Sequence, residues 1–206
     1  MQSIEEPKLQ AKEVLVAIKA VGINPVETYI RAGAYARLPN LPYTPGSDGA
    51  GVIDKIGDDV SGWNVGDRVY LSGSLSGTYA EKAVCSSDQI HKLPDHISFE
   101  QGASIYIPYA TAYASIFQRA QYVPFFILLI YDSALKFEKR AKPGESILIH
   151  GGSGGVGLAS IQLAKAKGLR VLATASSTVN FSNTSFKKGV TQFILLFVFV
   201  GRVGLH

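Results

Sequence analysis

A glycine-rich stretch from residue 150 to residue 157 carries the clearest chemical signal in the sequence. It reads His-Gly-Gly-Ser-Gly-Gly-Val-Gly, and the spacing of Gly151, Gly154 and Gly157 is typical of loops that hold the pyrophosphate of a dinucleotide. Glycine at such positions permits a tight turn, a close approach of the backbone to phosphate, and close packing of a helix on a strand. The alternative is a glycine-rich hairpin or linker that binds no ligand.

The elements on either side of this stretch favour the dinucleotide site. Residues 145–150 predict a strand that starts after the turn at residues 142–144, residues 158–167 predict a helix, and residues 169–174 predict a second strand. A glycine turn between a strand and a helix places the helix N-terminus, with its unpaired N–H groups and positive dipole end, beside an anion.

The end of the second predicted strand bears on which dinucleotide is bound. A carboxylate at this place normally accepts hydrogen bonds from the ribose 2′-hydroxyl of NAD. The sequence here is Ala-Ser-Ser-Thr, residues 175–178, which contains no acid. Hydroxyls and backbone amides tolerate a 2′-phosphate, so the sequence favours NADP(H), although no arginine or lysine is adjacent.

Composition excludes several other classes of protein. The 206 residues carry a net charge of only +4, without a long basic run, which argues against binding driven by bulk charge. Cys85 is the single cysteine, so we expect a reducing compartment and no thiolate metal cluster. The N-terminus lacks the pattern of a signal peptide. The apolar stretches 125–131 and 193–200 are shorter than the roughly 20 residues of a membrane span, so no membrane role is expected.

The first half of the chain predicts a small β-barrel. Short β-prone runs separated by glycine turns predict strands at residues 13–20, 52–56, 68–71, 77–84 and 90–94. Residues 41–51 hold several prolines and glycines and predict a sharply turned segment, whereas Asn24 and Pro25 predict the start of a short helix. Two further helices are expected at residues 99–105 and 111–119, separated by Pro108.

Several of these segments together carry a family resemblance. They are GINPVETYIRAGAY (22–35), LPYTPGSDGAGVI (41–53), GDRVY (66–70), GTYAEKAV (77–84), IPYATAY (107–113) and KPGESILIHGGSGGVGLASIQLAKAKG (142–168). In this order they resemble the zinc-free quinone oxidoreductases of the medium-chain dehydrogenase/reductase superfamily, the branch that includes zeta-crystallin. The resemblance implies an α/β plus β fold: a GroES-like β-barrel domain over residues 1–118, then an incomplete Rossmann domain, a doubly wound parallel sheet, over residues 119–206.

The resemblance also implies a function. Members of this branch reduce quinones and related enones with NADPH, are cytoplasmic, and assemble as homo-oligomers. Two alternatives stay open: a zinc-free enoyl reductase of the same superfamily, and a non-enzymatic RNA-binding or structural role like that of zeta-crystallin. The sequence shows no RNA-recognition signature and no basic stripe interleaved with aromatic residues.

Comparison with the zinc-dependent members of the superfamily predicts that no metal is bound. The positions that match their cysteine, histidine and cysteine ligands are Asn24, Ser47 and Ile107. An amide, a hydroxyl and a hydrocarbon side chain do not hold zinc, which requires thiolate, imidazole or carboxylate donors. Asp48 alone remains from that shell, so reduction must depend on the position of the nicotinamide and on hydrogen-bond donors at the acceptor oxygen.

The family's site residues match particular residues of this chain. By resemblance, Asn24 and Tyr29 line the nicotinamide and acceptor pocket, and Tyr29 is the candidate catalytic residue as orienter or proton donor. The alternative for Tyr29 is a ring packed on the barrel with its hydroxyl in solvent. Thr111 matches a threonine near the nicotinamide, and its alternative is a helix N-cap.

The remaining predicted contacts lie in the second domain. The resemblance implies that the pyrophosphate meets the backbone amides of Ser153, Gly154, Gly155 and Val156, and that Ser176 lies near the adenosine ribose. The four histidines are scattered along the sequence, and we expect them to be structural or exposed.

Three departures from the family limit what the chain is expected to do. The family's first strands are missing, residues 121–140 form an insertion, and residues 179–206 form an unrelated tail. The insertion and tail are typical of retained non-coding sequence. We therefore expect weak or absent NADPH turnover and impaired assembly, with the insertion exposing apolar surface unless it packs as an extra element.

Overall fold

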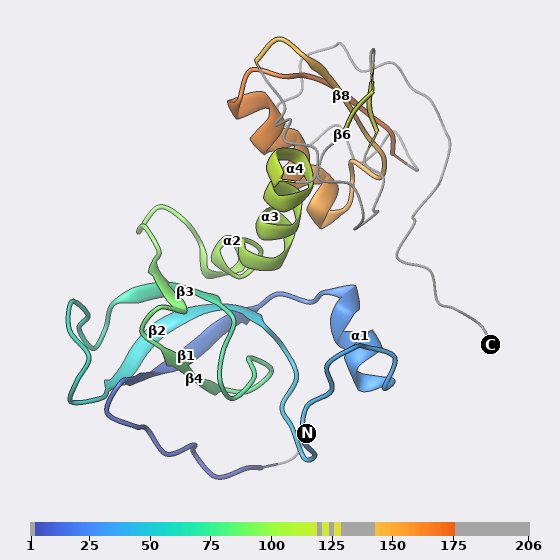
Figure 1. Ribbon diagram of the computed structural model, residues 1–206. Helices are drawn as coiled ribbons and strands as arrows, with labels where there is room; N and C mark the ends of the chain where they lie inside the picture. The colour runs from blue at the N-terminus through green and yellow to red at the C-terminus, as the bar shows by residue number, and fades with distance from the viewer. Residues whose placement is uncertain (1–2, 119–120, 124–125, 129–142, 176–206) are drawn as a thin grey trace. The chain divides into compact units, whose positions relative to one another are not determined.

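The computed structural model describes residues 3–118, 121–123, 126–128 and 143–175. The chain separates into two compact units, Met1–Ile107 and Pro108–His206. Each unit holds one of the two sheets drawn in Figure 1. The expected insertion is described only in part, and the expected tail, residues 179–206, lies outside the described residues.

The first unit is built on an antiparallel sheet of five strands. The strands are β1 (Glu13–Val21), β2 (Asp48–Ile56), β3 (Arg68–Ser72), β4 (Lys82–Ser86) and β5 (Ile90–Lys92), in the order β4-β1-β2-β3-β5. Every neighbouring pair is antiparallel, and the sheet forms a half-barrel. Helix α1 (Pro25–Arg31) follows β1 and helix α2 (Phe99–Ala103) follows β5. This is the GroES-like part of the predicted fold.

Alternation of apolar and polar residues explains why these segments form strands with one buried face. In β3, Val69 and Leu71 are buried whereas Arg68, Tyr70 and Ser72 are half-buried. A strand places successive side chains on opposite faces, so this period of two sends one face to the core. The members of that core are Val14, Val16, Ile53, Val69, Leu71, Cys85 and Ile90.

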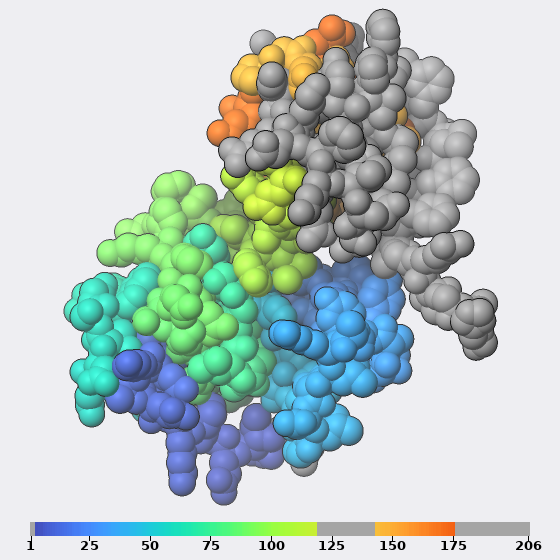
Figure 2. Space-filling view, viewed as in Figure 1, coloured from blue at the N-terminus to red at the C-terminus, as the bar shows by residue number. Residues whose placement is uncertain are grey.

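Some predicted boundaries were wrong in the first unit. The strand expected at residues 77–84 begins at Lys82, because the N–H groups of Thr78 and Tyr79 donate to Gly46 and Pro45 carbonyls instead of a strand ladder. Strand β2 begins at Asp48, inside the segment expected to be a turn. The loop that follows α1, residues 32–41, is exposed on the surface of the unit, in light blue in Figure 2.

Pro108 does not separate two helices as predicted. Helix α3 (Tyr106–Tyr113) includes it as the third residue and leads into a π-helical turn, Ala114–Gln118. A proline in the first turn of a helix breaks no hydrogen bond, because N–H groups there have no intrahelical acceptor. The expectation placed the helix boundary five residues too late.

The second unit contains a mixed sheet in the order β6-β7-β8-β9. Its strands are β6 (Gln121–Val123), β7 (Phe126–Leu128), β8 (Ser146–Ile149) and β9 (Arg170–Ala173). Strands β6 and β7 are antiparallel, and β8 is parallel to both β7 and β9. Part of the expected insertion thus packs as an extra element, because β6 and β7 extend the parallel pair.

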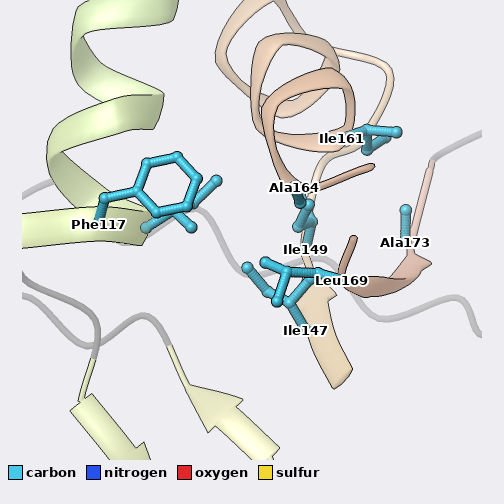
Figure 3. Packing of buried hydrophobic residues seen from close by; sticks show 8 residues of the cluster. Phe117, Ile147, Ile149, Ile161, Ala164, Leu169 and Ala173 are labelled. Atoms are coloured by element: carbon cyan, nitrogen blue, oxygen red, sulfur yellow. The ribbon is translucent and has the colours of Figure 1, made fainter. Parts of the chain in front are cut away.

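Helix α4 (Gly155–Ala166) connects β8 to β9 and completes the predicted strand, helix and strand. One face of α4 packs on the sheet through apolar side chains (Figure 3). The buried members of this core are Ile116, Phe117, Ile147, Ile149, Ile161, Ala164, Leu169 and Ala173. None of the helices within the described ranges combines the length and apolar character that a bilayer crossing requires.

Substitution of a core leucine of the barrel should be costly. Leu71 is 1% exposed, and Leu71→Ala should lower the free energy of unfolding by about 2–5 kcal/mol through lost burial and a cavity. Leu75 is 56% exposed and provides the matched control, since Leu75→Ala should change it by less than about 0.5 kcal/mol. Urea unfolding of both variants checks this, and equal losses would contradict the assignment of the core.

Candidate functional site

The glycine turn between β8 and α4 exposes backbone amides to solvent. Residues 153–156 are all exposed, and the first α-helical hydrogen bond runs from Leu158 N–H to Gly154 C=O at 2.8 Å. Amides at the start of a helix have no intrahelical acceptor. The N–H groups of Gly155 and Val156 therefore belong to an open helix N-terminus, which attracts an anion through its dipole as well as through hydrogen bonds.

Two of the glycines are required by the packing of this turn. A Cβ atom on Gly157 would lie 2.1 Å from the carbonyl oxygen of Gly151, and Gly151 has a φ of 70°. No other residue type fits at position 157, and few residue types adopt the positive φ of position 151. By contrast, Cβ atoms on Gly154 and Gly155 would come no nearer than 3.4 Å and 3.7 Å to other atoms. The turn is closed at its base and open at its tip, which fits a phosphate group.

A threonine at the end of β9 holds the base of the turn. Thr174 is 7% exposed, and its carbonyl oxygen accepts a hydrogen bond from Gly152 N–H at 2.7 Å. Its hydroxyl oxygen accepts from Gly151 N–H at 3.3 Å and lies 3.2 Å from Nδ1 of His150. Sequence reasoning missed Thr174, although a polar residue that directly follows an apolar strand was a usable signal.

Helix α3 also lies against the turn and α4. The side chain of Pro108 in α3 would be the nearest neighbour of a Cβ atom added to Gly155, and the hydroxyl of Tyr109 donates a hydrogen bond to Oε1 of Gln162 in α4. Burial raises the pKa of Tyr109, so its hydroxyl stays protonated and remains a donor. Helix α3 therefore braces the first turns of α4 within this unit.

The first unit contains a separate cluster of buried polar groups around two carboxylates. Asp48 is 1% exposed and accepts hydrogen bonds from Nδ2 of Asn24 at 2.9 Å and from Ile107 N–H at 3.1 Å. Glu27 in α1 is 7% exposed and accepts from Asn24 N–H at 2.6 Å. Asn24 thus links both carboxylates, one through its side chain and one through its backbone.

Glu27 has two further donors. The hydroxyl of Tyr79 donates to Oε2 at 2.6 Å, and Ser47 N–H approaches Oε1 at 3.3 Å. Buried carboxylates are tolerated when several donors surround them. Neither Glu27 nor Tyr79 was a predicted site residue, because the sequence separates them by two strands, β2 and β3, and several turns.

Burial is the main cause of the pKa shifts of Asp48 and Tyr79 in this cluster. Burial raises the pKa of Asp48 above its ordinary value, the charge of Glu27 adds to the effect, and the donors Asn24 and Ile107 oppose it. The pKa of Tyr79 is also raised, first by burial and then by its bond to Glu27. The phenol therefore stays protonated and serves as a fixed donor.

The positions that match zinc ligands meet in this cluster but do not form a zinc site. Asn24 uses its amide N–H on Asp48, while Ser47 and Ile107 contribute backbone N–H groups, which are donors and not metal ligands. Within the described residues, no three His, Cys, Asp or Glu side chains gather as a metal site would require. Buried Cys85, with its thiol pKa raised by burial to about 12, is a core side chain.

The other predicted residues are placed as follows. Tyr29 lies in α1 with its side chain 40% exposed, and Asn24 is the N-cap of the same helix. Thr111 is exposed in the interior of α3, so the alternative of a helix N-cap was wrong. Ser176 lies outside the described residues.

Removing the Tyr79 hydroxyl should destabilise the first unit. Tyr79→Phe deletes a donor to the buried Glu27 carboxylate and should lower the free energy of unfolding by about 1–3 kcal/mol. Tyr43 offers the matched control, because its hydroxyl is buried and has no hydrogen-bond partner among the described residues. Tyr43→Phe should leave stability unchanged or raise it. Chemical denaturation compares the two, and equal effects would contradict a role for the Tyr79 bond.

Comparison with known proteins agrees with both units. Residues 10–95 match the family described as alcohol dehydrogenase GroES-like domain. A quinone oxidoreductase from Mus musculus is 49% identical over 171 residues, which are 83% of this chain and 46% of the relative. The chain therefore spans about half the length of the curated relatives it matches.

Solved structures show the same fold. Escherichia coli quinone oxidoreductase complexed with NADPH is 32% identical, with a TM-score of 0.67 over 87% of this chain and 49% of that one. The CurK enoyl reductase is 27% identical, with a TM-score of 0.69 over 85% of this chain and 49% of that one. With a half-barrel sheet, a glycine turn of this geometry and relatives of this identity, the chain matches the quinone oxidoreductases of the medium-chain dehydrogenase/reductase superfamily over about half of their length.

Proposed function

We propose that the protein is a zinc-independent, NADPH-dependent quinone reductase. The observation that carries the proposal is the open glycine turn at the N-terminus of α4, whose geometry suits a pyrophosphate. The quinone oxidoreductase relatives and the NADPH-bound Escherichia coli structure support the choice of cofactor and acceptor. The proposed enzyme has a GroES-like domain at residues 1–118 and a partial Rossmann domain at residues 119–206.

The second domain would hold the dinucleotide. The amides of Ser153, Gly155 and Val156 would bind the pyrophosphate, with the dipole of α4 adding attraction for its charge. Gly154, whose N–H already donates to the Gly151 carbonyl, would line the same turn. Ser176 would lie near the adenosine ribose. Bound NADPH supplies the hydride, so the chain's own residues need only to bind, orient and exclude water.

The first domain would orient the nicotinamide and the acceptor. Nδ2 of Asn24 donates to Asp48, and a carboxylate only accepts, so the bond fixes which way the side-chain amide faces. Oδ1 faces the Glu27 N–H in the capping box of α1 and has a second lone pair for another donor. That oxygen suits the N–H of a nicotinamide carboxamide. Tyr29 would donate its hydroxyl hydrogen bond to the acceptor oxygen as negative charge develops there, and Thr111 would lie near the nicotinamide.

The buried hydrogen bonds of Asn24 suit a role in orienting the nicotinamide. Asn24 is held by two carboxylates, which limits the rotation of its side chain and helps to keep Oδ1 in one place. A preorganised hydrogen-bonding group costs little reorganisation when the ligand binds. A quinone is easily reduced, so orientation without a Lewis acid is chemically sufficient for hydride transfer.

Reduction of an enoyl substrate is the second candidate. The likeness to the CurK enoyl reductase favours it, because a quinone and an enone both accept hydride at a carbon conjugated to a carbonyl. Steady-state rates with a panel of quinones and enones separate the two activities. Cytoplasmic location, assembly into homo-oligomers and an RNA-binding role belong to the same resemblance, and RNA binding that ignores added NADPH would indicate a separate function.

Binding of NADPH to the 206-residue chain tests the proposal. Fluorescence titration should show saturable binding, weakened about tenfold or more in Gly157→Ala, because a Cβ there forces the turn and helix apart. Ala166→Ser, an exposed change in the last turn of α4, is the control and should bind as the parent chain does. Absence of saturable binding, or full affinity in Gly157→Ala, would contradict the proposal.

A further inference from the structure

Thr174 is joined to each of the three residues that open the glycine turn. Its backbone N–H donates to Ile149 at 2.9 Å, which continues the pairing of β8 with β9 beyond their last ladder residues. Its carbonyl accepts from Gly152 N–H, and its hydroxyl contacts Gly151 N–H and His150 Nδ1. A single residue directly after β9 thus contacts the turn through its backbone and its side chain.

The Thr174 hydroxyl provides an acceptor for the Gly151 N–H, which the backbone of Thr174 does not. Gly151 lies beyond the last paired residues of β8 and β9, so its N–H needs an acceptor outside the strand ladder. The Thr174 oxygen, on a side chain that is only 7% exposed, supplies that acceptor. Its own proton is then available for Nδ1 of His150, so one hydroxyl serves both neighbours.

The position of Gly151 governs the whole site. Its carbonyl oxygen accepts from Gly154 N–H at 3.0 Å, and the same oxygen forms the surface on which Gly157 packs. That carbonyl shares a peptide plane with Gly152 N–H, which the Thr174 carbonyl holds. The Gly151 N–H belongs to the preceding peptide plane, which the Thr174 hydroxyl holds. Rotation of the Gly151 backbone between these two planes would disturb both contacts and shift the amides at residues 153–156, so the acceptor of the Gly151 N–H helps to fix the backbone of the turn.

We propose that Thr174 is a positioning residue of this turn, and that its hydroxyl sets the backbone of Gly151 so that the α4 amides face the pyrophosphate. The inference rests on the proposed function for its ligand, and on the structure alone for the order of the turn. A purely structural role in the sheet needs only the backbone bonds of Thr174, which any residue except proline could make. Only the positioning role requires the side-chain hydroxyl, so removing the hydroxyl distinguishes it from the structural role.

Three variants of the full chain test this. Thr174→Val keeps the β-branched shape and removes the hydroxyl, and Thr174→Ser restores it. Ile147→Val removes a methyl group from the same core without touching the turn, so it controls for a general loss of stability. For each variant, thermal unfolding, amide hydrogen exchange at Gly151 and Gly152, and the NADPH dissociation constant are measured.

In Thr174→Val the Gly151 amide should exchange about tenfold faster, whereas Gly152 keeps its backbone acceptor and its protection. The dissociation constant of NADPH should rise about fivefold to tenfold and return to within about twofold in Thr174→Ser. Ile147→Val should lower the unfolding midpoint and leave the dissociation constant unchanged.

Two results would overturn the inference: parental exchange at Gly151 in Thr174→Val, or an equal loss of affinity in Ile147→Val. A parent chain that binds no NADPH would refute the proposed function and the affinity part of the inference with it. The exchange comparison needs no ligand, so it still decides whether the Thr174 hydroxyl orders the turn.

Discussion

The contact between Gly157 and the carbonyl of Gly151 is the constraint on which the second unit depends. With 2.1 Å available, only a hydrogen atom fits at Gly157, so α4 can approach the end of β8 closely enough to bury its apolar face. The same approach opens the helix N-terminus directly after the strand. Core packing and the ability to receive an anion therefore have one physical origin.

The first unit satisfies a different constraint, the burial of two carboxylates. Glu27 and Asp48 are excluded from water, and each accepts several hydrogen bonds from surrounding donors. Burial of such groups is costly unless donors are fixed in place. Asn24 is held by this requirement, and a side chain held for that reason is well suited to orient a ligand.

The elements of the second unit could be predicted from the sequence because each of them is specified by residues that are close together in the chain. An apolar run, a glycine turn and an amphipathic run predicted β8, α4 and β9, and the structure confirmed all three. In the first unit the existence of the strands was confirmed, but the start of β4 was wrong. The amides of Thr78 and Tyr79 pair with a distant loop, which no local pattern reveals.

The sequence by itself determined the glycine turn through residue types and short spacings. Through its family resemblance it also indicated the class of fold and the positions 24, 47 and 107, whose side chains are unsuitable as zinc ligands. Only the tertiary structure decided that Tyr79 donates to Glu27 and that Thr174 holds Gly151. The reason is geometric: those partners are brought together by strand pairing across many residues, and a hydrogen bond depends on distances that sequence separation does not encode.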